Sequence, residues 1–337
     1  MSAVSNPFRV ALVAMGLPPF EQWMLEKLTD NGIEMIHEEC DTPEQVLSVA
    51  ADADVVFVAG GSRVITAEVL ERLDRCGALL RSGAGTDNLP VDAATQLGIV
   101  VAHTPMAHAH AVAEHTVGLL FGTVRRIALQ DRFVRQGKWD RTLASPDWHV
   151  FGQTLGLVGF GNIGQLVAKK LSGLDMQILV ADPVVDGAVV EAHGATSVNL
   201  DELLQSSDYI SLHTPLTKGT YHLIGERELR LCKPRTVLIN TARGPVIDEQ
   251  ALVRALAEGW IAAAALDVLE QEPTPVDNPL LALDSAIITP HIAGISDESY
   301  DLVRIHSIDS LIALSKKHWP PWCANPEVEP RWQLQRE

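Results

Sequence analysis

The sequence predicts an α/β protein with two domains, each built on a parallel sheet that helices cover on both faces. Three observations support this fold class. At about 150 residues per domain, a chain of 337 residues favours two domains. Short apolar runs alternate with helical stretches almost throughout, which is the order that parallel sheets with crossover helices produce. The alternation begins again in the second half, at Gln153–Gly159.

The first half supplies the elements of the first sheet. Short continuous apolar runs are typical of strands that are buried on both faces, and the stretches between them have the pattern of helices. The predicted strands are Val10–Ala14, Val55–Ala59, Ala78–Leu80 and Ile99–Ala102, and the predicted helices include Phe20–Asn31 and Ala67–Arg75.

A long apolar segment, Ala109–Val124, lies between the two halves. Its residues are nearly all small or apolar, with Glu114 and His115 as interruptions. A helix that is apolar on every side is buried. We therefore expect this helix to lie inside a domain or across a subunit interface.

The second half supplies the elements of the second sheet. The predicted strands are Thr154–Val158, Met176–Ala181, Thr236–Thr241, Trp260–Val268 and Ala286–Thr289, and a helix is predicted at Gln165–Leu174. From Trp319 onward the tail contains four prolines. Since proline interrupts both helices and sheet ladders, the tail is predicted to be an irregular strap and not another domain.

Composition limits the classes of partner and the cellular location. Apolar residues make up 47% and charged residues 20%, as in globular proteins. The net charge of −17 argues against binding to nucleic acid or to an anionic membrane surface. No stretch approaches the roughly 20 apolar residues of a membrane span, the start does not have the pattern of a signal peptide, and the four cysteines show no CxxC spacing. These features predict a soluble protein of a reducing compartment, the cytoplasm.

A glycine-rich turn in the second half predicts a dinucleotide site. The predicted strand Thr154–Val158 leads directly into Gly159-Phe160-Gly161-Asn162-Ile163-Gly164, and a predicted helix follows. In this G-x-G-x-x-G pattern the first glycine makes a tight turn, the second lets the backbone approach a pyrophosphate, and the third lets the helix pack on the strand. The diphosphate would lie on free N–H groups at the positive end of the helix dipole.

The acid at the end of the next strand favours NAD over NADP. Asp182 directly follows the predicted strand Met176–Ala181. A carboxylate at this position can accept hydrogen bonds from both hydroxyls of the adenosine ribose. It would also repel the 2′-phosphate of NADP.

Three polar residues follow the carboxyl ends of predicted strands in the second half: Arg243, Glu272 and His291. Ligands bind at the carboxyl edge of a parallel sheet, so these side chains are expected at one site. A histidine can take or give a proton near neutral pH. A neighbouring carboxylate fixes its tautomer and favours its protonated form, and an arginine can clamp a substrate carboxylate with two hydrogen bonds. The set fits hydride transfer between a secondary alcohol and nicotinamide.

The chain resembles the D-isomer-specific 2-hydroxyacid dehydrogenases over roughly residues 50–300. The matching stretches occur in the family's order and together are highly specific: SGAGTDN at 82–88, TP…VAEHTVGLL at 104–120, GLVGFGNIG at 156–164, LHTPLT at 212–217, LINTARG at 238–244, ALDVLEQEP at 265–273 and TPHIAG at 289–294. The resemblance implies NAD-dependent interconversion of a D-2-hydroxy acid and its 2-keto acid. The implied substrate is a small acid of the glyoxylate or hydroxypyruvate kind.

The resemblance also implies roles for individual residues. Arg243 would bind the substrate carboxylate, Glu272 would pair with the histidine, and His291 would be the acid/base next to the substrate. The residues implied to bind the cofactor are Gly159, Gly161, Asn162, Ile163 and Gly164 at the diphosphate, Asp182 at the ribose, Thr214, Pro215, Thr241 and Ala242 along the cofactor, and Asp267 and Gly294 near the carboxamide. The backbone of Ala84 and Gly85 would face the substrate carboxylate, because the bare N–H groups of a glycine-rich loop form an anion nest.

The family architecture implies which residues form each domain and which ligand each domain binds. Residues 1–103 with 292–337 would form a flavodoxin-like substrate-binding domain, residues 104–291 would form the NAD-binding Rossmann domain, and the cleft would lie between them. The helix at 109–124 would lie in a homodimer interface. In the arm that follows, Trp139 is predicted to pack onto its own domain. Trp148, preceded by Ser145-Pro146-Asp147, is predicted to approach the active site of the neighbouring subunit.

Other functions are compatible with parts of this pattern. A D-3-phosphoglycerate dehydrogenase without a regulatory domain is one alternative, although Gly60-Gly61 stand where that enzyme typically carries an Arg-Ser pair. An NAD-binding corepressor could keep the same Arg, Glu and His, but the net charge and the lack of long disordered extensions argue against it. Formate dehydrogenases usually have Gln in place of Glu272.

Two histidines depart from the family pattern, because His103 and His108 stand where members usually have Asn. With His115 and Glu114, His108 could approach the arrangement of a metal site. The inferred chemistry needs no metal, however, so no metal is predicted. We expect instead that His108 lines the cleft and helps to select the substrate.

Overall fold

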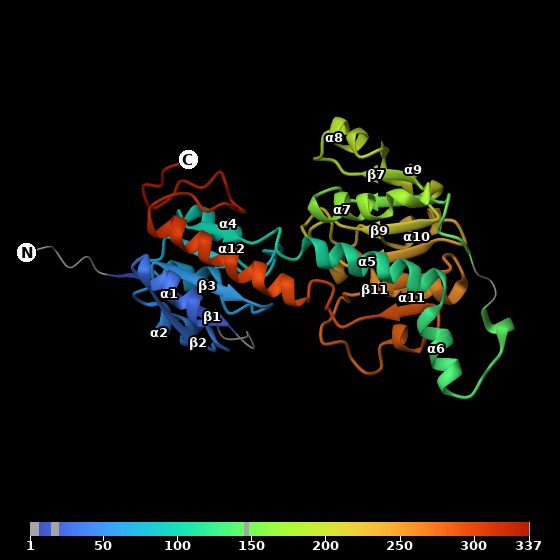
Figure 1. Ribbon diagram of the computed structural model, residues 1–337, viewed down its shortest axis with the longest axis horizontal. Coiled ribbons are helices and arrows are strands. Elements are labelled where there is room, and N and C mark those ends of the chain that lie inside the picture. Colours follow the sequence, from blue (N-terminus) through green and yellow to red (C-terminus); the bar gives the residue numbers. More distant parts are fainter. Residues whose placement is uncertain (1–6, 15–19, 145–147, 337) are drawn as a thin grey trace, which may run out of the picture. The chain divides into compact units, whose positions relative to one another are not determined.

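Each of the two parallel sheets expected from the sequence forms the centre of its own unit. The structure is a computed structural model that describes residues 7–14, 20–144 and 148–336. One unit contains Met1–His108 with Ser296–Glu337, and the other contains Ala109–Ile295 (Figure 1). The domains expected from the sequence, 1–103 with 292–337 and 104–291, have boundaries a few residues away from these.

The first unit has a five-stranded parallel sheet in the order β2-β1-β3-β4-β5. This is the flavodoxin-like strand order. Its elements are β1 (Phe8–Ala14), α1 (Gln22–Asp30), β2 (Ile33–Glu38), α2 (Pro43–Ala50), β3 (Val55–Ala59), α3 (Ala67–Glu71), β4 (Ala78–Arg81), α4 (Val91–Gln96), β5 (Val100–His103) and α12 (Asp297–Ser315).

Alternate strand residues of this sheet enter two apolar cores. On one face, Val56, Val58 and Leu79 pack with α2, α3 and α4. On the other face, Val55 and Phe57 pack with α1 and with the C-terminal α12. All five residues of β3 are buried, which confirms that this apolar run is a strand covered on both faces.

The second unit has a seven-stranded parallel sheet in the order β12-β11-β10-β9-β6-β7-β8. Its strands are β6 (Thr154–Val158), β7 (Gln177–Ala181), β8 (Thr196–Ser197), β9 (Tyr209–Leu212), β10 (Val237–Asn240), β11 (Ala263–Leu266) and β12 (Ala286–Ile288). Its α-helices are α5 (Ala109–Val124), α6 (Ile127–Arg135), α7 (Asn162–Leu171), α8 (Gly187–Ala192), α9 (Leu200–Ser206), α10 (Glu226–Leu231) and α11 (Glu249–Glu258). Short 3₁₀ turns occur at Arg141–Ala144, Ser172–Leu174, Gly244–Val246 and Pro279–Ala282.

The order of the strands reverses between β6 and β9. The chain runs outward from β6 through β7 to β8, and then returns to β9 on the other side of β6. In doubly wound sheets, ligands bind at such a reversal, beyond the carboxyl ends of the strands. Helices α5, α7 and α8 cover one face of the sheet, and α9, α10 and α11 cover the other.

Helix α5 has the predicted bounds, but it is not buried on every side within its unit. Val112, Thr116 and Leu119 are buried on one side of the helix. On the other side His110 and Gly118 are exposed, and a side chain placed on Gly118 would meet no atom within 4 Å. Of the two expected locations, burial entirely inside the domain is therefore wrong.

Several predicted elements are shorter than the apolar pattern suggested. Helix α3 ends at Glu71 and not at Arg75. The Arg75 guanidinium, beyond the helix, bonds to the Asp54 carboxylate at 2.8 and 3.1 Å. Strand β11 begins at Ala263 and not at Trp260. The indole of Trp260 instead packs under the Arg230 guanidinium at 3.6 Å. Helix α7, by contrast, begins three residues earlier than predicted, at Asn162.

The tail after Trp319 is an irregular strap, as predicted. The amide of Asn325 bonds to Val101 N and Ile99 O at 2.8 and 3.0 Å. The Trp332 ring lies so close to Gly77 that a side chain there would overlap it. These contacts fix the strap to the first sheet. Among the described helices, none is both long and apolar enough to span a bilayer.

The two tryptophans of the arm differ in burial, and the prediction for Trp139 is wrong. Trp139 is 85% exposed and does not pack onto its own domain. Trp148 is partly buried and packs against the apolar core of its own unit. Its approach to the active site of a neighbouring subunit stays a prediction. Ser145-Pro146-Asp147 lie outside the described residues.

Candidate active site

The glycine turn after β6 leaves room for a ligand at one of its three glycines. A side chain on Gly159 would lie 2.7 Å from the His213 carbonyl, and one on Gly164 would lie 2.6 Å from the Gly159 oxygen. Gly159 also has a φ of +92°, which residues with a side chain rarely adopt. At Gly161, by contrast, a side chain would meet no protein atom within 4 Å. The open space beside the turn is therefore at the position expected to approach a pyrophosphate.

Helix α7 presents uncapped N–H groups to this space. Gly161 is its N-cap and supplies no side-chain acceptor for the first turn. The N–H groups of Asn162, Ile163 and Gly164 belong to that turn. An anion at a helix N-terminus can satisfy such donors and is also favoured by the helix dipole. These residues fit the diphosphate of a dinucleotide.

Asp182, at the end of β7, is bound to the glycine turn. Its Oδ2 accepts a hydrogen bond from Phe160 N at 2.7 Å, and its Oδ1 accepts bonds from Val184 N and Val185 N at 2.8 and 3.0 Å. Burial raises the pKa of this carboxyl, but the three backbone donors outweigh burial and hold the pKa below its ordinary value. Asp182 is thus an anion, and since a carboxylate has about four acceptor positions, at least one is left for a ribose hydroxyl.

Residues beyond β9 and β10 lie along the same edge of the sheet. Thr214 and Pro215 follow β9, and the backbone of Thr214 packs against Gly159. Thr241 and Ala242 follow β10. The Thr241 hydroxyl contacts the hydroxyl of Thr116 on α5 at 2.8 Å. The predicted cofactor residues are therefore contributed by adjacent strands.

Arg243 follows β10 in a turn held by its own neighbours. Asn240 Nδ2 donates to the Arg243 carbonyl at 2.9 Å, and Ala242 N donates to Asn240 Oδ1 at 3.0 Å. The guanidinium donates to the Ala242 carbonyl at 2.7 Å. The next residue, Gly244, lies against the Leu269 carbonyl, where any side chain would clash. This packing joins the turn of Arg243 to the loop that carries Glu272.

His291 and Glu272 form a hydrogen-bonded pair. His291 Nδ1 lies 2.6 Å from Glu272 Oε2, and Leu269 N donates to Glu272 Oε1 at 3.0 Å. Burial raises the pKa of the Glu272 carboxyl, but the bonds from His291 and Leu269, with the charges of His291 and Arg243, lower the pKa below its ordinary value overall. Arg243 follows β10 and His291 follows β12, and these two strands flank β11 in the same parallel sheet.

Asp267 holds the turn on which His291 lies. Its carboxylate is 1% exposed and accepts hydrogen bonds from Ile292 N at 3.0 Å and Ala293 N at 2.8 Å. Gly294 follows directly and is partly exposed. The hydrogen bonds from Asp267 to this turn are observed. The contact of Asp267 and Gly294 with a nicotinamide carboxamide stays a prediction.

Ala84 and Gly85 belong to the first unit and follow β4. His103 Nδ1 lies 3.0 Å from the Ala84 carbonyl, and the Thr104 hydroxyl accepts a bond from Gly83 N at 2.7 Å. Burial lowers the pKa of the His103 imidazole, and the Arg81 charge adds to this effect. Neutral His103 and Thr104 thus hold the glycine loop. A side chain on Gly83 would meet the His108 ring at 3.6 Å.

Sequence reasoning missed a second histidine–carboxylate pair in the second unit. His222 Nε2 lies 2.7 Å from Glu270 Oε1, and the Tyr221 ring stacks on His222 with centroids 4.0 Å apart. Glu270 is two residues before Glu272, in the same loop. The only sign of this pair in the sequence was the Glu270 carboxylate. Nothing in the sequence predicts that His222 lies next to Glu270.

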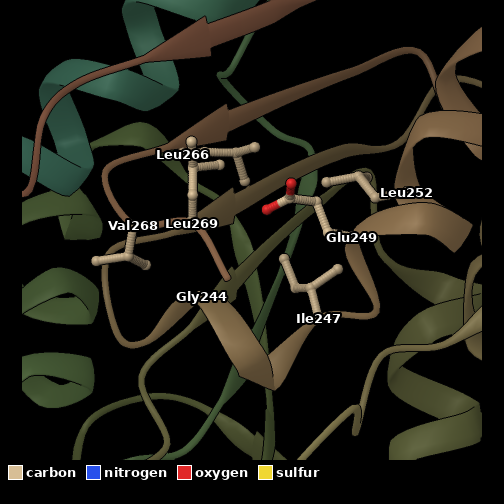
Figure 2. A pocket seen from close by; sticks show the side chains of 7 residues that line it. All are labelled: Gly244, Ile247, Glu249, Leu252, Leu266, Val268 and Leu269. Atoms are coloured by element: carbon tan, nitrogen blue, oxygen red, sulfur yellow. The ribbon is translucent and has the colours of Figure 1, made fainter. Parts of the chain in front are cut away.

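A small depression near this pair does not have the features of a substrate site. It is shallow and open to solvent, and it is lined by Gly244, Ile247, Glu249, Leu252, Leu266, Val268 and Leu269 (Figure 2). Its one charged group, the Glu249 carboxylate, already accepts bonds from Glu270 N and Asn278 Nδ2 at 3.0 and 2.7 Å. None of the predicted catalytic side chains lines it.

The histidines and the acid considered for a metal site make different contacts. Glu114 pairs with Lys170 at 2.7 Å, and His115 Nε2 contacts the Thr289 hydroxyl at 3.1 Å. Among residues 7–14, 20–144 and 148–336, no cluster of three or more His, Cys, Asp or Glu side chains could hold a metal ion.

Comparison with known proteins identifies the family. The family model described as "D-isomer specific 2-hydroxyacid dehydrogenase, NAD binding domain" matches residues 117–293, within the second unit. The glyoxylate reductase of Thermofilum pendens is 42% identical over 303 residues, which cover 87% of this chain and 88% of that protein. The D-3-phosphoglycerate dehydrogenase of Methanocaldococcus jannaschii is 42% identical over 259 residues. That match covers 77% of this chain but only 49% of the relative, so the match spans about half of its length.

Solved structures share the whole architecture. A glyoxylate reductase from Paecilomyes thermophila superposes with a TM-score of 0.87 and 30% identity, covering 96% of this chain and 99% of that one. An NADPH-dependent glyoxylate/hydroxypyruvate reductase from Sinorhizobium meliloti, in complex with NADP and malonate, has a TM-score of 0.83 and 28% identity, covering 97% and 99%. This chain therefore belongs to the D-isomer specific 2-hydroxyacid dehydrogenase family and is an oxidoreductase that acts on CH–OH groups with NAD(P).

Proposed function

We propose that this enzyme uses NADH to reduce a small 2-keto acid of the glyoxylate or hydroxypyruvate kind to the D-2-hydroxy acid. The observation that carries the proposal is the His291–Glu272 pair, 2.6 Å apart. It lies on the same sheet edge as the glycine turn of the dinucleotide site. The glyoxylate reductases among the similar proteins support the choice of substrate.

His291 supplies the proton in the proposed reduction. Its Nδ1 is engaged by Glu272, so Nε2 is the nitrogen left for the substrate. When bound, the reduced nicotinamide supplies the hydride to the carbonyl carbon. His291 gives the Nε2 proton to the carbonyl oxygen as negative charge develops there, and Glu272 stabilises the imidazolium before that transfer. In the reverse direction His291 takes the hydroxyl proton.

Arg243 holds the substrate carboxylate in this proposal. The Arg243 guanidinium can form two parallel hydrogen bonds to a carboxylate and can also polarise the adjacent carbonyl. Within the first unit, the N–H groups of Ala84 and Gly85 are proposed to form an anion nest. Because the whole protein carries a net charge of −17, local donors such as these must overcome a repulsive field.

A panel of 2-keto acids tests the proposed function. Purified protein would be mixed with NADH and with glyoxylate, hydroxypyruvate, phosphohydroxypyruvate or branched 2-keto acids, and NADH consumption would be followed by absorbance. We expect the highest kcat/KM with glyoxylate or hydroxypyruvate. Highest activity with phosphohydroxypyruvate would instead favour the phosphoglycerate dehydrogenase alternative, against which the exposed Gly60-Gly61 after β3 argue. Consumption with none of these acids would contradict the proposal.

Glu272→Gln is expected to shift the pH profile of reduction. Reduction needs protonated His291, and Glu272 stays ionised at neutral pH because its pKa is lowered. The variant loses the anion that stabilises the imidazolium, so the alkaline fall of kcat should move to lower pH. The matched control is Glu270→Gln, which removes the carboxylate that pairs with His222. A profile unchanged in Glu272→Gln would remove Glu272 from the mechanism.

Asp182→Ala is expected to relax the proposed preference for NADH. The variant loses both a ribose acceptor and the charge that repels a 2′-phosphate, so kcat/KM should fall for NADH and rise for NADPH relative to NADH. If Asp182 only held the turn through Phe160 N, both values would fall by the same factor. Asp186→Ala, which removes the N-cap of α8, is the control and should leave the ratio unchanged. Equal use of NADPH and NADH by the wild type would contradict this role.

We also propose that the enzyme is a homodimer formed through α5 and the arm that follows it. Among the residues of this region whose side chains are described, Ile127, Val134, Trp139 and Phe151 are large, apolar and exposed. Tryptophan is a frequent anchor of protein interfaces, and in this arm the exposed one is Trp139. Light scattering should report twice the 36.6 kDa of the chain, and a monomer would contradict the proposal.

A further inference from the structure

A chain of side-chain contacts leads from helix α5 to the turn that carries His291. His115 Nε2 lies 3.1 Å from Thr289 Oγ1, and Thr289 Oγ1 donates to Asp267 Oδ1 at 2.5 Å. His115 Nε2 is also 3.6 Å from the same Asp267 oxygen. The His115 side chain is 25% exposed and the Asp267 side chain is 1% exposed, so the contacts pass from the partly exposed helix to a buried anion.

The direction of these hydrogen bonds assigns the proton on His115. A carboxylate can only accept, so the Thr289 hydroxyl gives its proton to Asp267. The Thr289 oxygen is then an acceptor for His115. Consequently Nε2 is the ring nitrogen that carries a proton, and His115 acts here as a donor.

The anion at the end of this chain fixes a strained turn. Asp267 accepts bonds from Ile292 N and Ala293 N through its carboxylate, and its own carbonyl accepts a bond from His291 N at 2.8 Å. His291 has a φ of +54°, a left-handed conformation that residues with a side chain rarely adopt. Such a conformation persists only where the surroundings hold it. The orientation of the His291 ring therefore depends on the position of Asp267.

We propose that His115 is a positioning residue for His291. By donating to Thr289, it orients the hydroxyl that binds Asp267, and Asp267 in turn holds the backbone from His291 to Ala293. The neighbouring residue, Thr116, contacts Thr241, two positions before Arg243. Adjacent residues of α5 therefore contact the chain just after β10, which leads to Arg243, and just after β12, which leads to His291. The inference rests on the proposed function, in which His291 transfers the proton.

The test compares His115→Leu with His115→Gln. Leucine removes the donor, whereas glutamine can place an amide N–H near the position of Nε2. In His115→Leu we expect kcat for keto-acid reduction to fall at least about 10-fold, because misplacement of a catalytic group by 1 Å can cost up to about 100-fold. The Kd for NADH, measured by fluorescence, should change less than twofold. His115→Gln should recover most of kcat, and His110→Leu, on the exposed side of the same helix, should leave kcat and Kd unchanged.

A double-mutant cycle with Thr289→Val keeps the inference testable if His115→Leu folds poorly. Thr289→Val breaks the same chain from its other end and should lower kcat by a similar factor. In the double variant the two losses should not add, because both remove one chain of contacts. Wild-type kcat in folded His115→Leu or Thr289→Val, or equal losses in His115→Leu and His115→Gln, would overturn the inference. A wild type inert toward every 2-keto acid would overturn the proposed function, and the inference with it.

Discussion

His291→Ala is expected to lower kcat for keto-acid reduction by about 10²- to 10⁴-fold, the usual contribution of general acid–base catalysis. The variant loses the only proton donor that the proposed mechanism places at the carbonyl oxygen. Its affinity for NADH should be kept, since the glycine turn, α7 and Asp182 do not depend on the imidazole. Stopped-flow or steady-state absorbance would measure turnover, and fluorescence would measure NADH binding.

The matched control for His291→Ala is His222→Ala. Both histidines pair with a carboxylate in the second unit, at 2.6 and 2.7 Å, and both have a positive φ. The two variants therefore remove the same chemistry from two positions. Turnover should survive in His222→Ala. If it is lost there and kept in His291→Ala, the catalytic pair has been assigned to the wrong histidine.

Arg243→Lys is expected to produce the other large loss. Lysine keeps the charge but replaces a planar fork with a point charge, so the two parallel bonds to the substrate carboxylate are lost. Disrupting a buried charge pair costs at least about 2 kcal/mol, which corresponds to roughly a 30-fold lower kcat/KM. Since Arg243 binds the substrate in this proposal, the KM for NADH should change little.

The control for Arg243→Lys is Arg235→Lys, just before the amino end of the same strand. Arg235 bonds to Gln153 at 2.7 Å and pairs with Asp208, at the edge opposite to the candidate site. A substitution there should leave kcat/KM unaltered. Wild-type kinetics in Arg243→Lys would contradict the role of a carboxylate clamp and would place substrate binding elsewhere on the edge.

Local patterns were sufficient to predict most of the fold and to propose the residues of the site. Helix α5 and strands β3 and β6 have the bounds that the apolar runs predicted. For the two strands the reason is that short continuous apolar runs are typical of strands buried on both faces. Arg243, Asp267 and His291 leave adjacent parallel strands, so strand order alone brings them to one edge. The glycines of the turn were predicted from spacing, whereas the packing of Gly159 against the His213 carbonyl is a contact between distant parts of the chain.

The arm could not be predicted in the same way. Trp139 and Trp148 are alike in the sequence, yet one is exposed and the other packs against the core of its unit. Whether an apolar side chain is buried depends on the apolar surface that distant segments of the chain place next to it. For the same reason, α5 has an exposed side despite its apolar composition.

By itself, the sequence determined the two parallel sheets, the glycine turn and the three residues proposed for catalysis, since these follow from periodicity, spacing and strand ends. Only the tertiary structure decided which side chains touch across the fold. It paired His222 with Glu270, bound Asp182 to the glycine turn, and joined His115 through Thr289 to Asp267. Such contacts join residues up to 174 positions apart, and hydrogen bonds depend on distances of a few tenths of an ångström, which no local pattern in a single chain encodes.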